Sequence, residues 1–168
     1  MSKYTGFDKI ATAKLPGLEQ FVDLCHRRWG FQNLGTLNVR LMRSAPPGTK
    51  PNDPKWMSVH ATGRACDLGY KKPADRDKVV QAIAWLTDPA VVATLGVEEL
   101  HDYSGLSKKG TEKWGRGWRI GRGWKDWTAT DNGGTPGGAW IHVELSPDKA
   151  HLSAEEFLAL WKSLPKPA

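Results

Sequence analysis

The apolar residues of this 168-residue chain repeat with two different periods, and the change of period divides the chain into short segments. Four segments have the spacing of an amphipathic helix. They are residues 15–30, 74–89, 89–96 and 153–164. Ser153 and Glu156 predict a capping box at the start of the last helix. Any fold for this chain must therefore bury the apolar faces of several separate helices.

Between these helices apolar and polar residues alternate, which predicts strands. The predicted strands are residues 36–43, 65–70, 97–105 and 139–145. Four prolines in residues 44–55 predict a surface loop, and residues 106–138, rich in Gly, Trp, Lys and Arg, predict hairpins and loops. Helices beside such short strands favour an α+β fold with a small, mostly antiparallel sheet and flanking helices. The length fits one domain, residues 1–168.

Composition narrows the classes of function. No run of about 18 apolar residues is present, so membrane insertion is not expected. The N-terminal residues lack the apolar core of a secretory signal, which predicts synthesis in a cytoplasm without a signal peptide. The net charge of +6 favours a polyanion, either nucleic acid or the acidic polymers of a bacterial cell wall. Of the two cysteines, Cys66 is expected to be a small buried side chain.

Residues 57–70 hold the densest group of chemically active side chains. His60 and Asp67 are seven residues apart, and Gly63 between them would allow the backbone to turn. A histidine at a turn and an aspartate on the next strand can bind the same ion, and zinc favours imidazole and carboxylate ligands. A third ligand would then have to come from elsewhere in the chain.

The strand predicted at "WIHVEL" supplies such a ligand. His142 lies on this strand, and Trp140 and Glu144 share its face because side chains two residues apart point the same way. His60, Asp67 and His142 are therefore candidates for one metal site. Glu144 is the nearest carboxylate to His142 in the sequence.

The stretch "SVHATGRACD" resembles the pattern S-x-H-x-x-G-x-A-x-D. Its fixed positions are Ser58, His60, Gly63, Ala65 and Asp67. This pattern is the signature of the zinc peptidases grouped as the lysostaphin, D-Ala-D-Ala metallopeptidase and sonic hedgehog superfamily. A later histidine, on a strand similar to "WIHVEL", completes the site in its peptidase branch. The chain resembles bacteriophage members that cut the peptides of peptidoglycan, and the resemblance implies a hedgehog-like or DD-peptidase-like fold.

The resemblance also implies a role for each matched residue. The implied ligands of Zn²⁺ are His60, Asp67 and His142. Ser58 would brace the turn of the motif, and Arg40, in preference to Arg43, would stabilise the oxyanion or bind a substrate carboxylate. His101 and Trp140 are expected to contact the substrate beside the metal. Water on the zinc would attack an amide carbonyl at neutral pH.

The general base is the point at which the chain departs from the family pattern. Many members carry a glutamate three residues before the last histidine ligand, where this chain has Ala139, which cannot transfer a proton. Glu144 is the expected replacement, and Asp131, His101 or Asp102 are alternatives. The alanine could also be an engineered substitution, or the chain a natural relative that keeps zinc without catalysis.

These observations predict a zinc-dependent peptidase that hydrolyses amide bonds in the peptide part of peptidoglycan. It would be a monomeric phage endolysin, released through membrane holes, or a virion-borne lysin. The alternative is a catalytically silent, zinc-stabilised module that binds the cell wall.

The Trp-rich, basic residues 106–138 are expected to form a wall of the cleft, with about half of the tryptophans in the core. Interleaved aromatic and basic residues suit sugar rings and anionic wall polymers, and equally single-stranded nucleic acid. A nucleic-acid binder is not expected, because it would not explain why His60, Asp67 and His142 occur together.

Overall fold

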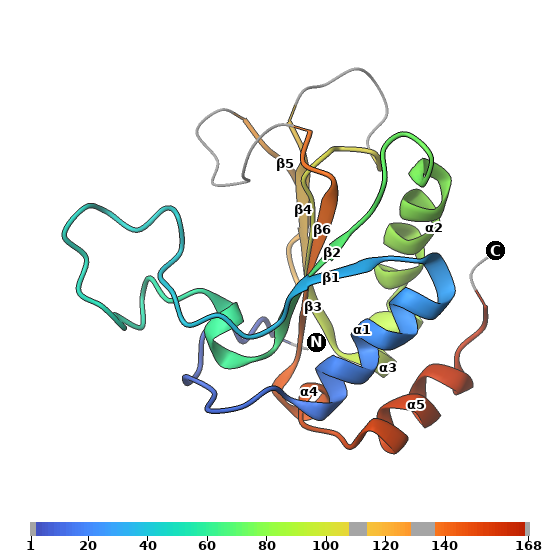
Figure 1. Ribbon diagram of the computed structural model, residues 1–168, viewed down its shortest axis with the longest axis horizontal. Coiled ribbons are helices and arrows are strands. Elements are labelled where there is room, and N and C mark those ends of the chain that lie inside the picture. Colours follow the sequence, from blue (N-terminus) through green and yellow to red (C-terminus); the bar gives the residue numbers. More distant parts are fainter. Residues whose placement is uncertain (1–2, 108–113, 129–136, 167–168) are drawn as a thin grey trace.

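In the computed structural model, which describes residues 3–107, 114–128 and 137–166, six strands form an open antiparallel sheet (Figure 1). The strands are β1 (Gln32–Gly35), β2 (Ala65–Gly69), β3 (Val97–Asp102), β4 (Arg116–Arg119), β5 (Gly123–Asp126) and β6 (Trp140–Leu145). Their order in the sheet is β1-β2-β6-β3-β4-β5, so β6 lies between β2 and β3. The expected α+β class with an antiparallel sheet is confirmed.

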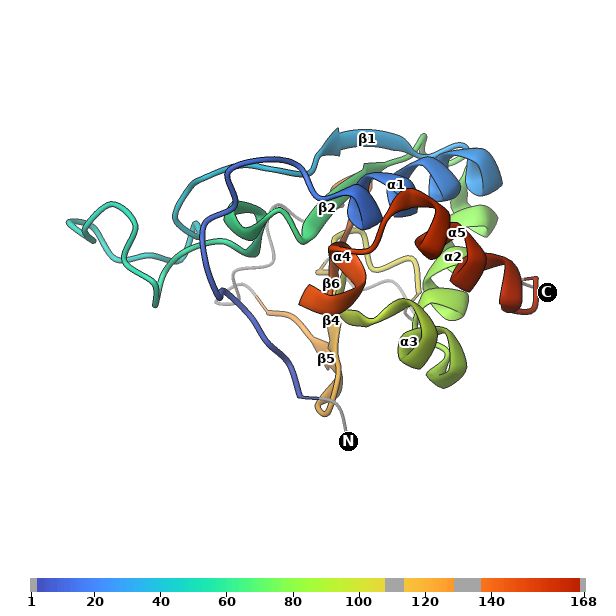
Figure 2. The ribbon, with the colours of Figure 1, turned by 90° about the horizontal axis from the view of Figure 1, so that it is seen from below.

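Helices cover one face of this sheet, whereas the long loop after β1 lies on the other side (Figures 1 and 2). The helices are α1 (Pro16–Trp29), α2 (Arg76–Leu86), α3 (Pro89–Leu95), α4 (Pro147–Ala150) and α5 (Ala154–Ser163). Strand residues such as Leu68, Leu100 and Val143 are fully buried in one core with the helices. Cys66 is buried there too, as expected. The apolar half of each alternating strand therefore faces the helices.

The four predicted helices are confirmed to within three residues at each end. The capping box is present, because Ser153 Oγ accepts from the backbone of Glu156 and the Glu156 side chain accepts from the backbone of Ser153. The hairpin expected within residues 106–138 is β4 with β5. Within the described residues, no helix is long and apolar enough to cross a membrane.

The strand predicted at residues 36–43 is wrong. The strand lies earlier, at β1, and within 36–43 only Leu41 forms a β-bridge, an isolated one to Met57. The alternation in this segment does not correspond to burial, since Val39 is 50% exposed. The segment instead runs beside residues 56–60, where Asn38 N donates to His60 O. It therefore borders the face of the sheet that the helices leave uncovered.

Candidate metal centre

The uncovered face of the sheet carries two rows of mostly polar side chains. Antiparallel pairing places Asp67 of β2, His142 of β6 and His101 of β3 side by side. The next row, two residues along each strand, consists of Ala65, Glu144, Glu99 and Arg119. Because side chains two residues apart share a face, both rows point away from the helices. The pairing of β6 with both β2 and β3 brings these distant residues together.

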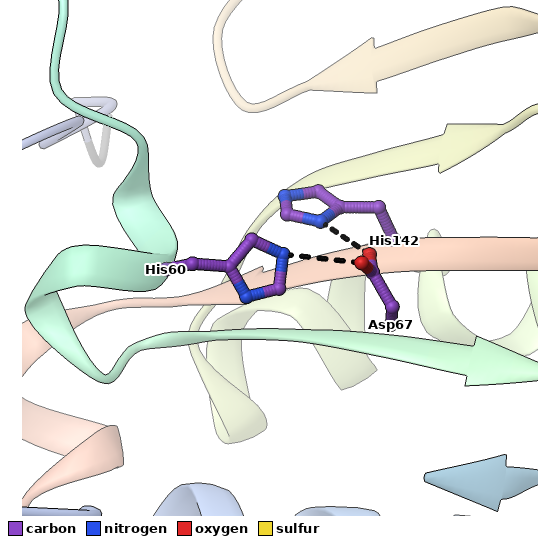
Figure 3. Close-up of side chains that lie close together, drawn as sticks. All are labelled: His60, Asp67 and His142. Carbon is purple, nitrogen blue, oxygen red and sulfur yellow. Dashed lines mark hydrogen bonds and ion pairs between the residues drawn. The ribbon is translucent and has the colours of Figure 1, made fainter. Parts of the chain in front are cut away.

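His60 reaches this face from a short 3₁₀ helix, η1 (Val59–Thr62), that precedes β2. Ser58 Oγ accepts a hydrogen bond from the backbone N–H of His60 at 3.3 Å, which caps the start of η1. Gly63 ends η1 with a φ of 70°, and a Cβ at this position would lie 3.2 Å from Leu15 Cγ. Both the backbone conformation and the packing therefore favour glycine here. The turn points His60 toward Asp67 (Figure 3).

Three side chains converge at this point (Figure 3). His60 Nε2 lies 3.4 Å from Asp67 Oδ2, and His142 Nδ1 lies 2.9 Å from Asp67 Oδ1. One ligand atom from each of the three residues lies within 4.8 Å of the others. Ligand atoms bound to a tetrahedral zinc ion at about 2.1 Å are separated by about 3.4 Å. The donor set and its spacing therefore fit a metal ion, and this cluster could hold one.

Hydrogen bonds on the far side of each imidazole determine which nitrogen faces the cluster. His60 Nδ1 donates to the carbonyl oxygen of Thr36 at 3.3 Å, which leaves Nε2 toward Asp67. His142 Nε2 lies 3.0 Å from Glu144 Oε1, which leaves Nδ1 toward Asp67. Metal-binding histidines in proteins are commonly held by such outer partners. The two rings are therefore already oriented for a shared ion.

The charges around the cluster favour a cation at its centre. Burial disfavours the charged form of His142, but its hydrogen bonds and charge interactions with Asp67 and Glu144 raise its pKa to about 10. Burial also opposes ionisation of Asp67, yet hydrogen bonds from His142 and His60 hold its pKa well below the usual range. Asp67 is therefore a carboxylate, the form in which it binds metals.

Glu144 lies at the edge of the His142 ring that faces away from Asp67. Its Oε1 contacts His142 Nε2, and its Oε2 accepts a hydrogen bond from the hydroxyl of Tyr4 at 2.9 Å. The side chain is almost fully buried. Both carboxylate oxygens thus already have partners, and one of those partners is a candidate metal ligand. Nothing in the sequence pattern indicated Tyr4, which is far from Glu144 along the chain.

His101 belongs to a second, partly buried cluster beside the first. Its Nε2 lies 3.2 Å from Glu99 Oε1, and Arg119 donates to both oxygens of Glu99 at 2.9 and 3.1 Å. Burial opposes ionisation of Glu99, but the bond from His101 and the charge of Arg119 lower its pKa to about 2. The rings of His101 and His142 are 5.1 Å apart. The spacing of Glu99 and His101, two residues apart on a strand, could have indicated from the sequence that they contact each other. No sequence pattern indicated that Arg119 joins them.

The cluster lines a cleft of about 510 Å³. Tyr103, Trp127 and Trp140 form an aromatic wall, in which the Tyr103 ring lies 4.8 Å from Trp140 and 5.4 Å from Trp127. Arg40 and Arg43, both exposed, line the cleft from the loop that follows β1. The cleft thus joins an aromatic wall, two exposed arginines and the cluster of candidate metal ligands.

Among the alternative bases, Asp102 does not reach the cluster. Asp102 is fully buried on the opposite face from His101, where it accepts hydrogen bonds from Ser107. The suggestion that it could serve as the base is therefore wrong, because a strand turns adjacent side chains to opposite faces. Asp131 lies outside the described residues. Ala139, just before β6, accepts a backbone hydrogen bond from Tyr70 at 3.0 Å and packs against the core.

The Trp-rich stretch divides between the cleft and the core. Trp127 lines the cleft, whereas Trp118 and Trp124 pack against the core. The guanidinium of Arg116 lies 3.8 Å from the centre of the Trp124 ring. This basic side chain therefore stacks on an aromatic ring of the protein itself. The basic residues at 108, 109 and 113 lie outside the described residues.

Comparison of the chain with protein-family models, with curated proteins and with solved structures found no match. Two imidazoles and a carboxylate converge, outer hydrogen bonds orient the imidazoles, and the cluster opens to a cleft.

Proposed function

We propose that the chain is a zinc-dependent peptidase that hydrolyses amide bonds in the peptide part of bacterial peptidoglycan. The observation that carries the proposal is the cluster of His60, Asp67 and His142 beside a cleft. Three protein ligands of this type leave a fourth position of a zinc ion for water or substrate, as catalytic zinc sites require. The resemblance of residues 58–67 to the zinc peptidase pattern supports the substrate class.

When bound, zinc supplies a Lewis acid that polarises an amide carbonyl and lowers the pKa of water to about 7. The protein side chains do the rest. His60 presents Nε2 and His142 presents Nδ1, and each ring is held by the partner of its other nitrogen. Arg40 and Arg43 line the cleft, where a guanidinium suits a carboxylate of the substrate or a developing oxyanion.

Two side chains are candidates for moving the proton from water to the leaving amine. Glu144 has both oxygens in hydrogen bonds, one of them to His142. His101 lines the cleft, lies against the His142 ring, and is held through Nε2 by Glu99. Its Nδ1 has a longer contact, 3.4 Å, to the hydroxyl of Tyr103, which is longer than either hydrogen bond of Glu144. The geometry therefore favours Glu144 for holding His142 and His101 for transferring the proton.

The test is loss of turbidity of permeabilised cell-wall preparations. The parent chain is compared without metal, with zinc restored, and as the variants His142→Ala and Ala139→Glu. His151→Ala is the matched control, because it removes an exposed histidine after α4 and leaves the cleft intact. Lysis that needs zinc and His142, but not His151, supports the peptidase. Tight zinc binding without lysis in the parent and in Ala139→Glu would refute it.

A silent zinc-stabilised module that binds the cell wall is the second candidate. It is favoured by Ala139, an apolar side chain that stands where many members of the resembled family carry the base. In that case the protein would sediment with cell walls and lose this binding, or its fold, when zinc is removed. Co-sedimentation measured beside the turbidity assay separates the two functions.

A further inference from the structure

The N-terminal residues before α1 run past the sheet and contact several of its strands (Figure 2). Thr5 donates from its backbone and its hydroxyl to Glu98 of β3, at 3.1 and 2.7 Å. Farther along, Ala11 N donates to Ala61 O of η1 at 2.8 Å. The buried guanidinium of Arg64 contacts both Gly6 O and Asp8. Residues 5–11 are therefore held against the fold by several contacts.

Tyr4 is the residue of this segment that enters the cleft. Its hydroxyl donates to Glu144 Oε2 at 2.9 Å, and the guanidinium of Arg119 lies 3.9 Å from the centre of its ring. Burial and the nearby charge of Glu144 raise the pKa of the phenol, so the hydroxyl stays protonated and acts as a donor. Tyr4 thus connects the N-terminal segment to the network around the metal cluster.

We infer that Tyr4 is a positioning residue of the metal site, which acts on His142 through Glu144. The inference rests on the proposed metal site. The terminal torsion of a glutamate is broad and does not define the plane of the carboxylate by itself. In this chain the Tyr4 hydroxyl holds Oε2 and His142 holds Oε1, so two hydrogen bonds define that plane. Glu144 in turn keeps the proton of His142 on Nε2 and leaves Nδ1 for the metal.

The role of the hydroxyl can be separated from the docking of the segment. Tyr4→Phe removes the hydrogen bond to Glu144 and keeps the ring beside Arg119. Thr5→Val is the matched control, because it removes one side-chain hydrogen bond of the neighbouring residue, to Glu98, and does not touch Glu144. A purely structural contribution of the segment would affect both variants alike.

The experiment measures the dissociation constant for Zn²⁺ by competition with a chromophoric chelator, using the full chain. Loss of a direct hydrogen-bond partner of a metal ligand weakens metal binding by about 10–100-fold. Tyr4 is one hydrogen bond farther from the metal site than Glu144. We therefore expect about 3–10-fold weaker Zn²⁺ binding in Tyr4→Phe. The visible spectrum of the Co²⁺-loaded protein reports ligand geometry. It should change in Tyr4→Phe and stay as in the parent in Thr5→Val.

The outcomes separate this inference from the proposed function. If the parent binds Zn²⁺ and Tyr4→Phe binds it equally, or if Thr5→Val weakens binding as much as Tyr4→Phe, the positioning role is overturned while the metal site stands. If the parent binds no Zn²⁺, the proposed function and this inference both fail. Weaker binding and a changed Co²⁺ spectrum in Tyr4→Phe alone support the inference.

Discussion

Replacing Glu144 by glutamine separates two roles of this residue in the proposed peptidase, which are to hold the candidate metal ligand His142 or to transfer a proton. Glu144 Oε1 lies 3.0 Å from His142 Nε2, and Oε2 accepts from Tyr4 at 2.9 Å. A glutamine has nearly the same size, and its single oxygen can accept from His142 while its amide donates to the Tyr4 hydroxyl. The substitution therefore removes the charge and leaves the network connected.

The expected magnitude follows from the change in one hydrogen bond. Bonds to charged groups contribute about 1.5–3 kcal/mol and neutral ones about 0.5–1.5 kcal/mol, so the loss is roughly 1–1.5 kcal/mol. That loss corresponds to about tenfold weaker zinc binding. Loss of a general base would instead lower kcat by about 10²–10⁴-fold, at any zinc concentration.

The assay is zinc affinity by chelator competition, followed by the rate of turbidity loss at saturating zinc. If Glu144 holds His142, Glu144→Gln binds zinc about tenfold more weakly and recovers a rate within about tenfold of the parent once zinc is saturating. Glu155→Gln, which removes the same charge from the exposed side of α5, is the control. A rate more than about 100-fold below the parent with zinc bound would refute the reasoning and identify Glu144 as the base.

Three further predictions concern other parts of the site. His101→Gln lowers kcat about 10²–10⁴-fold at saturating zinc, with zinc affinity unchanged in the chelator assay. Gly63→Ala lowers the free energy of unfolding by about 1–3 kcal/mol in urea titrations, because alanine is strained at a φ of 70° and its Cβ crowds Leu15. Burial opposes the charge on His142, but Asp67 and Glu144 raise its pKa to about 10, above the unfolded value of about 6.5. In chelator, its contribution to stability is complete below pH ~6.5 and is lost as the pH rises through about 10, so the melting temperature falls over this range in the parent and not in His142→Gln.

Local patterns in the sequence predicted four of the described helices, all except α4, and placed strands β2, β3 and β6. The capping residues Ser153 and Glu156 marked the start of α5, and helical spacing marked α1, α2 and α3. Period-two alternation also placed His142 and Glu144 on one face of β6, because this depends only on the geometry of a single strand. The same rule failed at residues 36–43, since alternation does not reveal whether either face meets a core.

The candidate ligands were also accessible from the sequence, because His60, Gly63 and Asp67 form a local pattern and His142 lies on a strong strand signal. Glu144 and His101 could also be named from the sequence, but the remaining partners that orient and surround the ligands could not. Glu99 and Arg119 join the site only because β3 pairs with β6 and β4 pairs with β3, and Tyr4 joins it only because the N-terminal segment docks against the sheet. Local sequence determines which way a side chain points along its own strand, whereas the order of strands depends on how distant segments bury their apolar faces together. The tertiary structure therefore decided which residues surround the cluster of His60, Asp67 and His142.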